Sequence, residues 1–141
     1  MLLIFLITEI MIKFLGINIK MQKFREFKTS SGKKVLAGKD AKTNEELIEQ
    51  AGKEELIFHT AKPGSPFVNI KSKKPSIKDI RETAVFCAMK SQDWRDNKND
   101  VVVHYFHGKD VHKEKGMKLG TFGVRKFKVI KIKKEEMLNK K

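Results

Sequence analysis

The segment Val101–Phe106 limits the fold more than any other part of this chain. It reads VVVHYF, and it follows the polar segment Asp96–Asn99. A strand with one wet face alternates apolar and polar residues, whereas a nearly continuous apolar run of this length is typical of a strand covered on both faces. We therefore predict that this strand is central in a sheet and that helices pack on the sheet.

Further strands are predicted before this segment. Ser30–Gly32 reads as the turn of a hairpin, and Pro63–Pro66 must also turn, because two prolines deny backbone donors around a flexible glycine. The sequence between and around these turns predicts strands at residues 24–29, 33–38, 56–61 and 67–71.

The segment Phe122–Lys133 is predicted to close the fold. Its period breaks, because Phe127 and Val129 fall on one face of a strand whereas Ile130 and Ile132 fall on the other. We expect either a β-bulge at this break or burial of both faces.

Two helices are predicted. Pro75 and Ser76 open the longer one, and its apolar side recurs at three and four residues through Ile77, Ile80, Ala84, Ala88 and Ser91, widened by Val85 and Cys87. The shorter helix begins near Thr43, which with Glu46 fits a capping box, and ends at Gly52. The predicted fold is α+β, with a mixed, mostly antiparallel sheet, one long helix and one short helix.

A chain of 141 residues and 16.3 kDa favours a single domain. We place it at residues 22–134, followed by a basic C-terminal tail at 135–141 with a disordered end at Lys140 and Lys141. Residues 1–21 form an apolar extension interrupted by Glu9 and Lys13. Because two charges disfavour a spanning helix, the extension is a misassigned start, a membrane anchor or an element that covers the core. We expect membrane contact only if the extension is genuine.

The charge of the chain points to a polyanionic partner. Lys and Arg number 31 against 17 Asp and Glu, which gives a net charge of +14 and a pI of 9.9. Most of the excess lies in residues 61–80 and 109–134. A surface that serves only solubility mixes both signs, so this clustering favours a binding face. A merely solvated lysine-rich surface is the alternative.

Other chemistry has little support in the sequence. Cys87 lies among apolar helix residues and is expected to be buried. As the only cysteine, it excludes an internal disulfide and a multi-cysteine zinc site, and it favours a reducing cytoplasm. His104, His107 and His112 lack the spacing of metal ligands. We predict no catalytic residue, no metal and no cofactor.

The best single candidate for a phosphate contact is His59, which lies near Lys62, Gly64 and Ser65. A glycine turn lets backbone amides approach an anion, and imidazole offers a donor. The alternatives are a histidine that only fixes the turn, and a hydrolase that uses His59 and Ser65.

Four aromatic residues could either stack on unpaired bases or belong to the core. These are Trp94, Phe106, Phe122 and Phe127.

Several separated blocks resemble the NFACT-R domain, the RNA-binding module at the C-terminal end of ribosome-quality-control factors. The resemblance covers about residues 22–134 and rests on Phe24–Ile48, Glu55–Lys71 and Asp110–Ile132. Single residues that match the family are Gly38, Asn44, His59, Gly64, Ser65, Ser91, Trp94 and Lys113, while Pro66 and Phe67 resemble its archaeal variant. Because 141 residues leave no room for the other domains of these factors, the resemblance implies a stand-alone, archaeal-type version.

The resemblance implies a cytoplasmic, non-catalytic protein that binds ribosomal RNA or tRNA, with the large ribosomal subunit as a further partner. The residues expected to bind RNA are Lys39, Asn44, His59, Lys62, Gly64, Ser65, Lys71, Lys73, Lys74, Arg95, Lys113, Lys115, Lys118 and Arg125. Two alternatives stay open: a general nucleic-acid or DNA-binding role, which the same charges would serve, and a module that binds ribosomal proteins.

Overall fold

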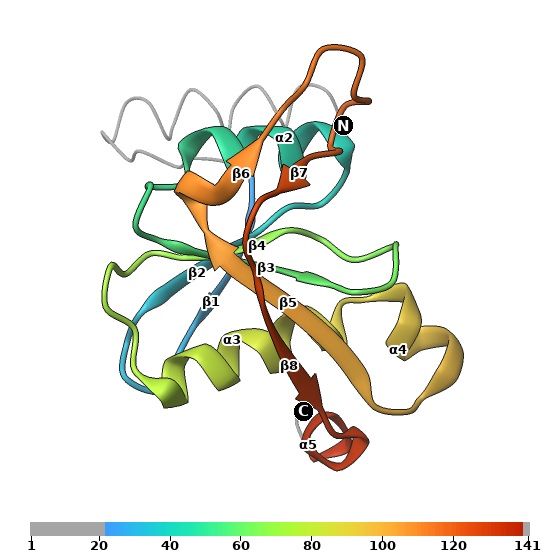
Figure 1. The fold of residues 1–141 in the computed structure, drawn as a ribbon. Coiled ribbons are helices and arrows are strands. Elements are labelled where there is room, and N and C mark those ends of the chain that lie inside the picture. Colours follow the sequence, from blue (N-terminus) through green and yellow to red (C-terminus); the bar gives the residue numbers. More distant parts are fainter. Residues whose placement is uncertain (1–21, 140–141) are drawn as a thin grey trace, which may run out of the picture.

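The computed structural model describes residues 22–139. The predictions for residues 1–21 and for Lys140 and Lys141 lie outside this range. No helix within residues 22–139 is long and apolar enough to cross a bilayer. The elements shown in Figure 1 are β1 (Arg25–Lys28), β2 (Lys34–Ala37), α2 (Ala41–Gln50), β3 (Leu56–Thr60), β4 (Val68–Ile70), α3 (Ile77–Met89), α4 (Gln92–Asn97), β5 (Val101–His107), η1 (Gly108–Asp110), β6 (Val111–His112), β7 (Gly123–Val124), β8 (Lys128–Ile132) and α5 (Lys134–Leu138).

Six strands form the main sheet, in the order β1-β2-β4-β3-β5-β8. Every pair in it is antiparallel, so the predicted mostly antiparallel sheet is confirmed. The strand predicted to be central, β5, lies between β3 and β8. The short strands β6 and β7 pair separately, in a hairpin that extends beyond α2 (Figure 1).

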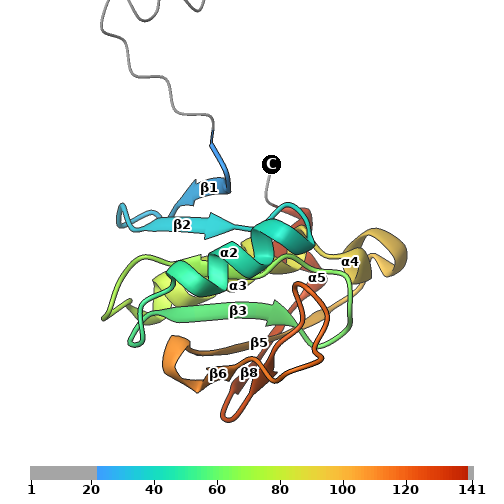
Figure 2. The ribbon, with the colours of Figure 1, turned by 90° about the horizontal axis from the view of Figure 1, so that it is seen from above.

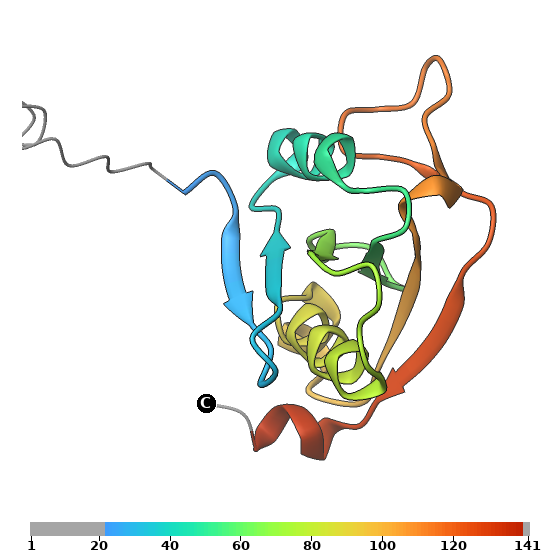
Figure 3. The same ribbon diagram turned by 90° about the vertical axis from the view of Figure 1, so that its left-hand side faces the viewer.

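Helices cover both faces of this sheet. Val103 of β5 packs with Ala84 and Ala88 of α3 on one face. Phe106 of the same strand packs with Leu47 of α2 on the other face. Both sides of β5 are therefore covered, as the apolar run predicted. Figure 2 shows α2 in front of α3, and Figure 3 shows α3 enclosed between β1 and β2 on one side and β5 and β8 on the other.

The two predicted helices exist, with one correction to each. Helix α2 is capped by Asp40 rather than Thr43, because Asp40 Oδ1 accepts a hydrogen bond from Thr43 N at 2.8 Å and Thr43 Oγ1 accepts one from Asp40 N at 2.9 Å. Helix α3 begins after the Ser76 cap, as predicted. However, Ile77, its first residue, is 87% exposed and does not belong to the buried side of the helix.

The prediction for the closing segment was wrong. The segment divides into β7 and β8, and β8 pairs with β5 without a bulge from Val101↔Ile132 to Tyr105↔Lys128. The covered face of β8 is the one that carries Ile130 and Ile132, because both pack against the core cluster that includes α3. Ile132 is fully buried, whereas Phe127 and Val129 are 51% and 58% exposed.

Two short helices were not predicted. Helix α4 follows α3 directly, with Ser91 as its cap. Helix α5 follows β8 and places Met137 in the core, where only 2% of its surface remains exposed. Arg81 of α3 holds α5 through hydrogen bonds of 2.7 Å to both carboxylate oxygens of Glu136. The core therefore continues past residue 134.

Candidate nucleic-acid interface

The turn between β3 and β4 is held rigidly by its own residues. Ser65 Oγ accepts a hydrogen bond from Thr60 N at 3.0 Å and donates one to Pro66 O at 3.2 Å. Gly64 has a φ of +93°, and a Cβ there would lie 2.8 Å from Gln92 Cβ. Gly64 O also accepts a hydrogen bond from Gln92 N at 2.8 Å. A glycine is required here because the turn packs closely on α4 in a left-handed conformation.

The start of α2 is fastened to the end of the same turn. Asn44 Oδ1 accepts a hydrogen bond from Phe67 N at 3.1 Å, and Gly38 N donates to Phe67 O at 3.0 Å. A Cβ at Gly38 would collide with Asn44 Oδ1. The glycine and asparagine that match the family therefore form one structural unit with the turn.

These segments surround a hollow of about 270 Å³ that we call the cationic hollow. It is lined by Arg25, Gly38, Lys39, Asn44, Gly64, Ser65, Pro66, Lys90 and Arg95. Five residues predicted to bind RNA, Lys39, Asn44, Gly64, Ser65 and Arg95, thus come together from four separate segments. Arg25 and Lys90 were not predicted, because each stands alone in its own segment and joins the others only after folding.

The four cations of the cationic hollow keep their charge unpaired. Arg95 donates to Lys90 O at 3.2 Å and to Gln92 Oε1 at 2.9 Å, and Lys39 Nζ donates to Gln22 O at 3.0 Å. These acceptors are neutral, so they orient the side chains without cancelling their charge. Within residues 22–139, none of the four cations forms an ion pair, and no carboxylate lines the hollow. Such an arrangement attracts a multivalent anion.

His59 lies in a second hollow beside the first, with Gly64 in the wall of both. Its Nδ1 makes a 2.8 Å hydrogen bond to Thr60 O, and its ring lies 4.5 Å from that of Phe67. Burial lowers the pKa of His59, and the hydrogen bond to Thr60 opposes this only in part. The ring is therefore neutral at pH 7 and helps to fix the turn. A phosphate contact from His59 stays a prediction.

Two of the other predicted cations, Lys71 and Lys113, form ion pairs within the protein. Lys71 Nζ lies 2.7 Å from Glu55 Oε1, and Lys113 Nζ lies 3.1 Å from Glu45 Oε2. Lys113 Nζ also donates to Lys118 O at 2.6 Å and to Thr121 O at 2.9 Å, which holds the β6–β7 loop together, while the contact with Glu45 fastens that loop to α2. The charges of Lys71 and Lys113 are thus largely compensated within the fold.

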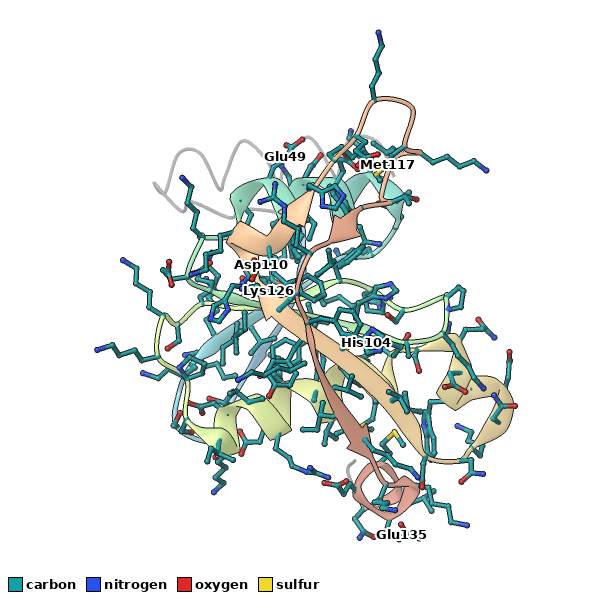
Figure 4. All side chains as sticks on the ribbon, in the orientation of Figure 1. Glu49, His104, Asp110, Met117, Lys126 and Glu135 are labelled. Atoms are coloured by element: carbon teal, nitrogen blue, oxygen red, sulfur yellow. The ribbon has the colours of Figure 1, made fainter. Side chains whose placement is uncertain are left out.

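The remaining predicted cations lie elsewhere on the surface. Lys73, Lys74 and Arg125 line a third and larger hollow. Lys62 Nζ lies 3.6 Å from Asp93 Oδ1. Lys115 and Lys118 are exposed on the β6–β7 loop, the loop that carries Met117, which is labelled in Figure 4.

The residues considered for other chemistry are mostly structural. Trp94 is only 6% exposed and belongs to the core, which decides the question left open by the sequence. Cys87 is fully buried, as predicted, and burial raises the pKa of its thiol to about 12. Within residues 22–139, no group of three or more His, Cys, Asp or Glu side chains could hold a metal ion.

Together, these segments form a small α+β domain that carries a cationic hollow beside the β3–β4 turn. Residues 23–126 match the family model described as the NFACT protein RNA binding domain, and the chain belongs to this family. This confirms the family predicted from the sequence.

Two relatives support the assignment. The chain is 31% identical over 98 residues to the archaeal Rqc2 homolog aRqcH of Methanocaldococcus jannaschii, a match that covers 64% of this chain and 15% of that protein. The structure of the C-terminal part of the fibronectin/fibrinogen-binding protein from Streptococcus suis is similar, with a TM-score of 0.73 and 29% identity. That match covers 82% of this chain and 47% of the other. The chain therefore spans less than half the length of either relative.

Proposed function

We propose that the cationic hollow binds the phosphate backbone of structured RNA, with ribosomal RNA or tRNA as the partner. The observation that carries this proposal is the set of four unpaired cations, Arg25, Lys39, Lys90 and Arg95, around a rigid turn. Phosphate contacts supply a large share of the affinity of nucleic-acid-binding proteins. Arg95 and Lys39 are already oriented by hydrogen bonds, so these two side chains lose little entropy when they bind.

The setting that we propose is the large ribosomal subunit, in ribosome-associated quality control in the cytoplasm. Support comes from membership of the RNA-binding family and from the similarity to an archaeal Rqc2 homolog. The proposal for this chain is limited to RNA contact. The hydroxyl of Ser65, one of the residues of the hollow, is engaged within its own turn.

The test is a competition between ribosomal RNA, tRNA and duplex DNA for the full chain at one fixed salt concentration. The double variant Lys39→Gln/Arg95→Gln is compared with a control variant, Lys78→Gln, which removes an exposed charge outside the hollow. We expect ribosomal RNA or tRNA to displace duplex DNA, and the double variant to weaken that binding much more than the control does. Equal competition by all three nucleic acids would contradict the RNA preference and support a general polyanion-binding role.

Crosslinking in native cells identifies the partner directly. RNA and protein partners are recovered from the same sample and read together. Crosslinks to ribosomal RNA or tRNA are the expected result. Crosslinks to ribosomal proteins alone, with binding that hardly responds to salt, would instead support a protein-interaction module.

A further inference from the structure

The third and larger hollow, lined by Lys73, Lys74 and Arg125, lies apart from the cationic hollow and shares no lining residue with it. We call it the basic groove. It measures about 770 Å³, within the range of about 300–1,000 Å³ that is common for ligand sites. Its basic residues come from the β4–α3 loop, from the connection between β7 and β8 and from the start of β8, and they are Lys73, Lys74, Arg125, Lys126 and Lys128.

The charge of this groove is strongly unbalanced. Asp110 is the single carboxylate among its lining residues, and Figure 4 labels it together with Lys126, another residue of the lining. Within residues 22–139, none of the five cations forms an ion pair. By contrast, the nearby Lys131 and Lys133 both lie within 4.0 Å of Asp100, at 3.6 and 3.7 Å. The groove is therefore lined by five cations without an ion-pair partner among the described residues.

The groove also has an apolar side, which the cationic hollow lacks. Leu56, Pro75, Ile80, Tyr105 and Phe127 contribute to its lining. Tyr105 is held in place by stacking on Phe58, with ring centroids 5.5 Å apart. A phosphate backbone alone has no apolar group that could contact this surface. A ligand that fits both parts carries negative charge and a flat apolar face.

Phe127 is the most unusual of these residues. Its ring stacks on His104, with the centroids 4.4 Å apart and the planes inclined by 24°, and yet the residue is 51% exposed. The ring therefore contacts His104 and still leaves about half of the residue open to solvent along the groove. Burial lowers the pKa of His104, which favours the neutral form of the ring that stacks on Phe127.

We propose that the basic groove binds an unpaired segment of RNA, with one base stacked on the open face of Phe127 and the adjoining phosphates held by Lys73, Lys74 and Arg125. A duplex hides its bases in the stack, whereas an unpaired segment presents a base and its phosphates together. This inference rests on the RNA binding proposed above. It adds a second site and the chemical class of its ligand.

An acidic peptide is the principal rival occupant. It would satisfy the five cations, but it would leave the exposed ring of Phe127 without a partner. A nucleotide satisfies both features, because every base has a flat face that can stack on an aromatic ring. The combination of free cations with a supported and exposed aromatic ring therefore favours unpaired RNA.

The experiment uses the full chain and a single-stranded oligoadenylate that contains 2-aminopurine, whose fluorescence falls when it stacks. Phe127→Ala and Phe127→Leu are compared with Val129→Ala, a control that truncates another exposed residue of the same strand face outside the groove. We expect the Phe127 variants to weaken oligonucleotide binding by about 5- to 100-fold and to abolish quenching, while Phe127→Trp and the control retain both. Melting curves verify that each variant is folded.

Three results would overturn this inference. The first is equal binding by Phe127→Ala and Val129→Ala, the second is binding without quenching, and the third is displacement of the oligonucleotide by polyglutamate at equal charge. Binding of ribosomal RNA or tRNA that depends on Arg95 provides the separate readout for the cationic hollow. If that binding persists while any of the three results is found, only the basic groove is refuted. If the chain binds neither structured nor unpaired RNA, both proposals fail.

Discussion

Replacing Arg95 by Gln tests whether RNA is held at the cationic hollow or by the net charge of the whole protein. Arg95 is held by two neutral acceptors, so its charge is free to meet a phosphate. Each phosphate contact contributes about 0.7–0.9 to the slope of log K against log salt. Losing one contact should lower that slope by this amount and weaken binding by roughly 5- to 8-fold at about 0.1 M salt, or about 1 kcal/mol.

The assay is fluorescence anisotropy with labelled tRNA or a ribosomal RNA fragment across a series of salt concentrations. Lys78→Gln is the matched control, because it removes one exposed charge from α3 and lines neither the cationic hollow nor the basic groove. Its slope should stay at the wild-type value. If Arg95→Gln and Lys78→Gln give the same slope and the same affinity, the charge acts diffusely and the assignment of the hollow is wrong.

Three further predictions concern the structural support of the site. Gly38→Ala should lower the free energy of unfolding, measured by urea denaturation, by about 1–3 kcal/mol, because the new methyl group displaces Asn44 from its hydrogen bond. The double variant Gly38→Ala/Asn44→Ala should lose much less free energy of unfolding than the sum of the losses in the two single variants. The hydrogen bond from Ser31, aided by that from Ser76 N, lowers the pKa of the buried Asp79 from 3.8 to about 2. The ionised carboxylate therefore stabilises the folded protein fully above pH 4, and this stabilisation is lost as the pH falls through 2. Asp79→Asn should lower the free energy of unfolding at pH 7 by on the order of 1–2 kcal/mol, and the difference from the wild type should vanish below pH 2. Cys87, whose thiol pKa is raised to about 12 by burial, should react with thiol reagents at pH 8 only after denaturation, and rapid labelling of the native protein would contradict its placement.

Local sequence patterns were sufficient for most of the fold. The run Val101–Phe106 located a strand between two others, and the Ser76 cap with its apolar period located α3. These features are decided within a few residues by hydrogen bonding and side-chain spacing. The same reasoning failed at Phe127 and Val129, because periodicity reports which residues share a face but not whether another element covers that face. Whether a face of β8 is covered depends on which elements pack on that face in the completed fold.

The sequence by itself determined the excess of positive charge and the family to which the chain belongs, since both are properties of residues in order. Only the tertiary structure decided which cations are free to bind. Lys113 meets Glu45 across 68 residues of chain and is compensated, whereas Arg25 and Arg95 come together where no carboxylate lies. The physical reason is that Coulomb attraction depends on distance in space, and a folded chain sets those distances between residues that are remote in sequence.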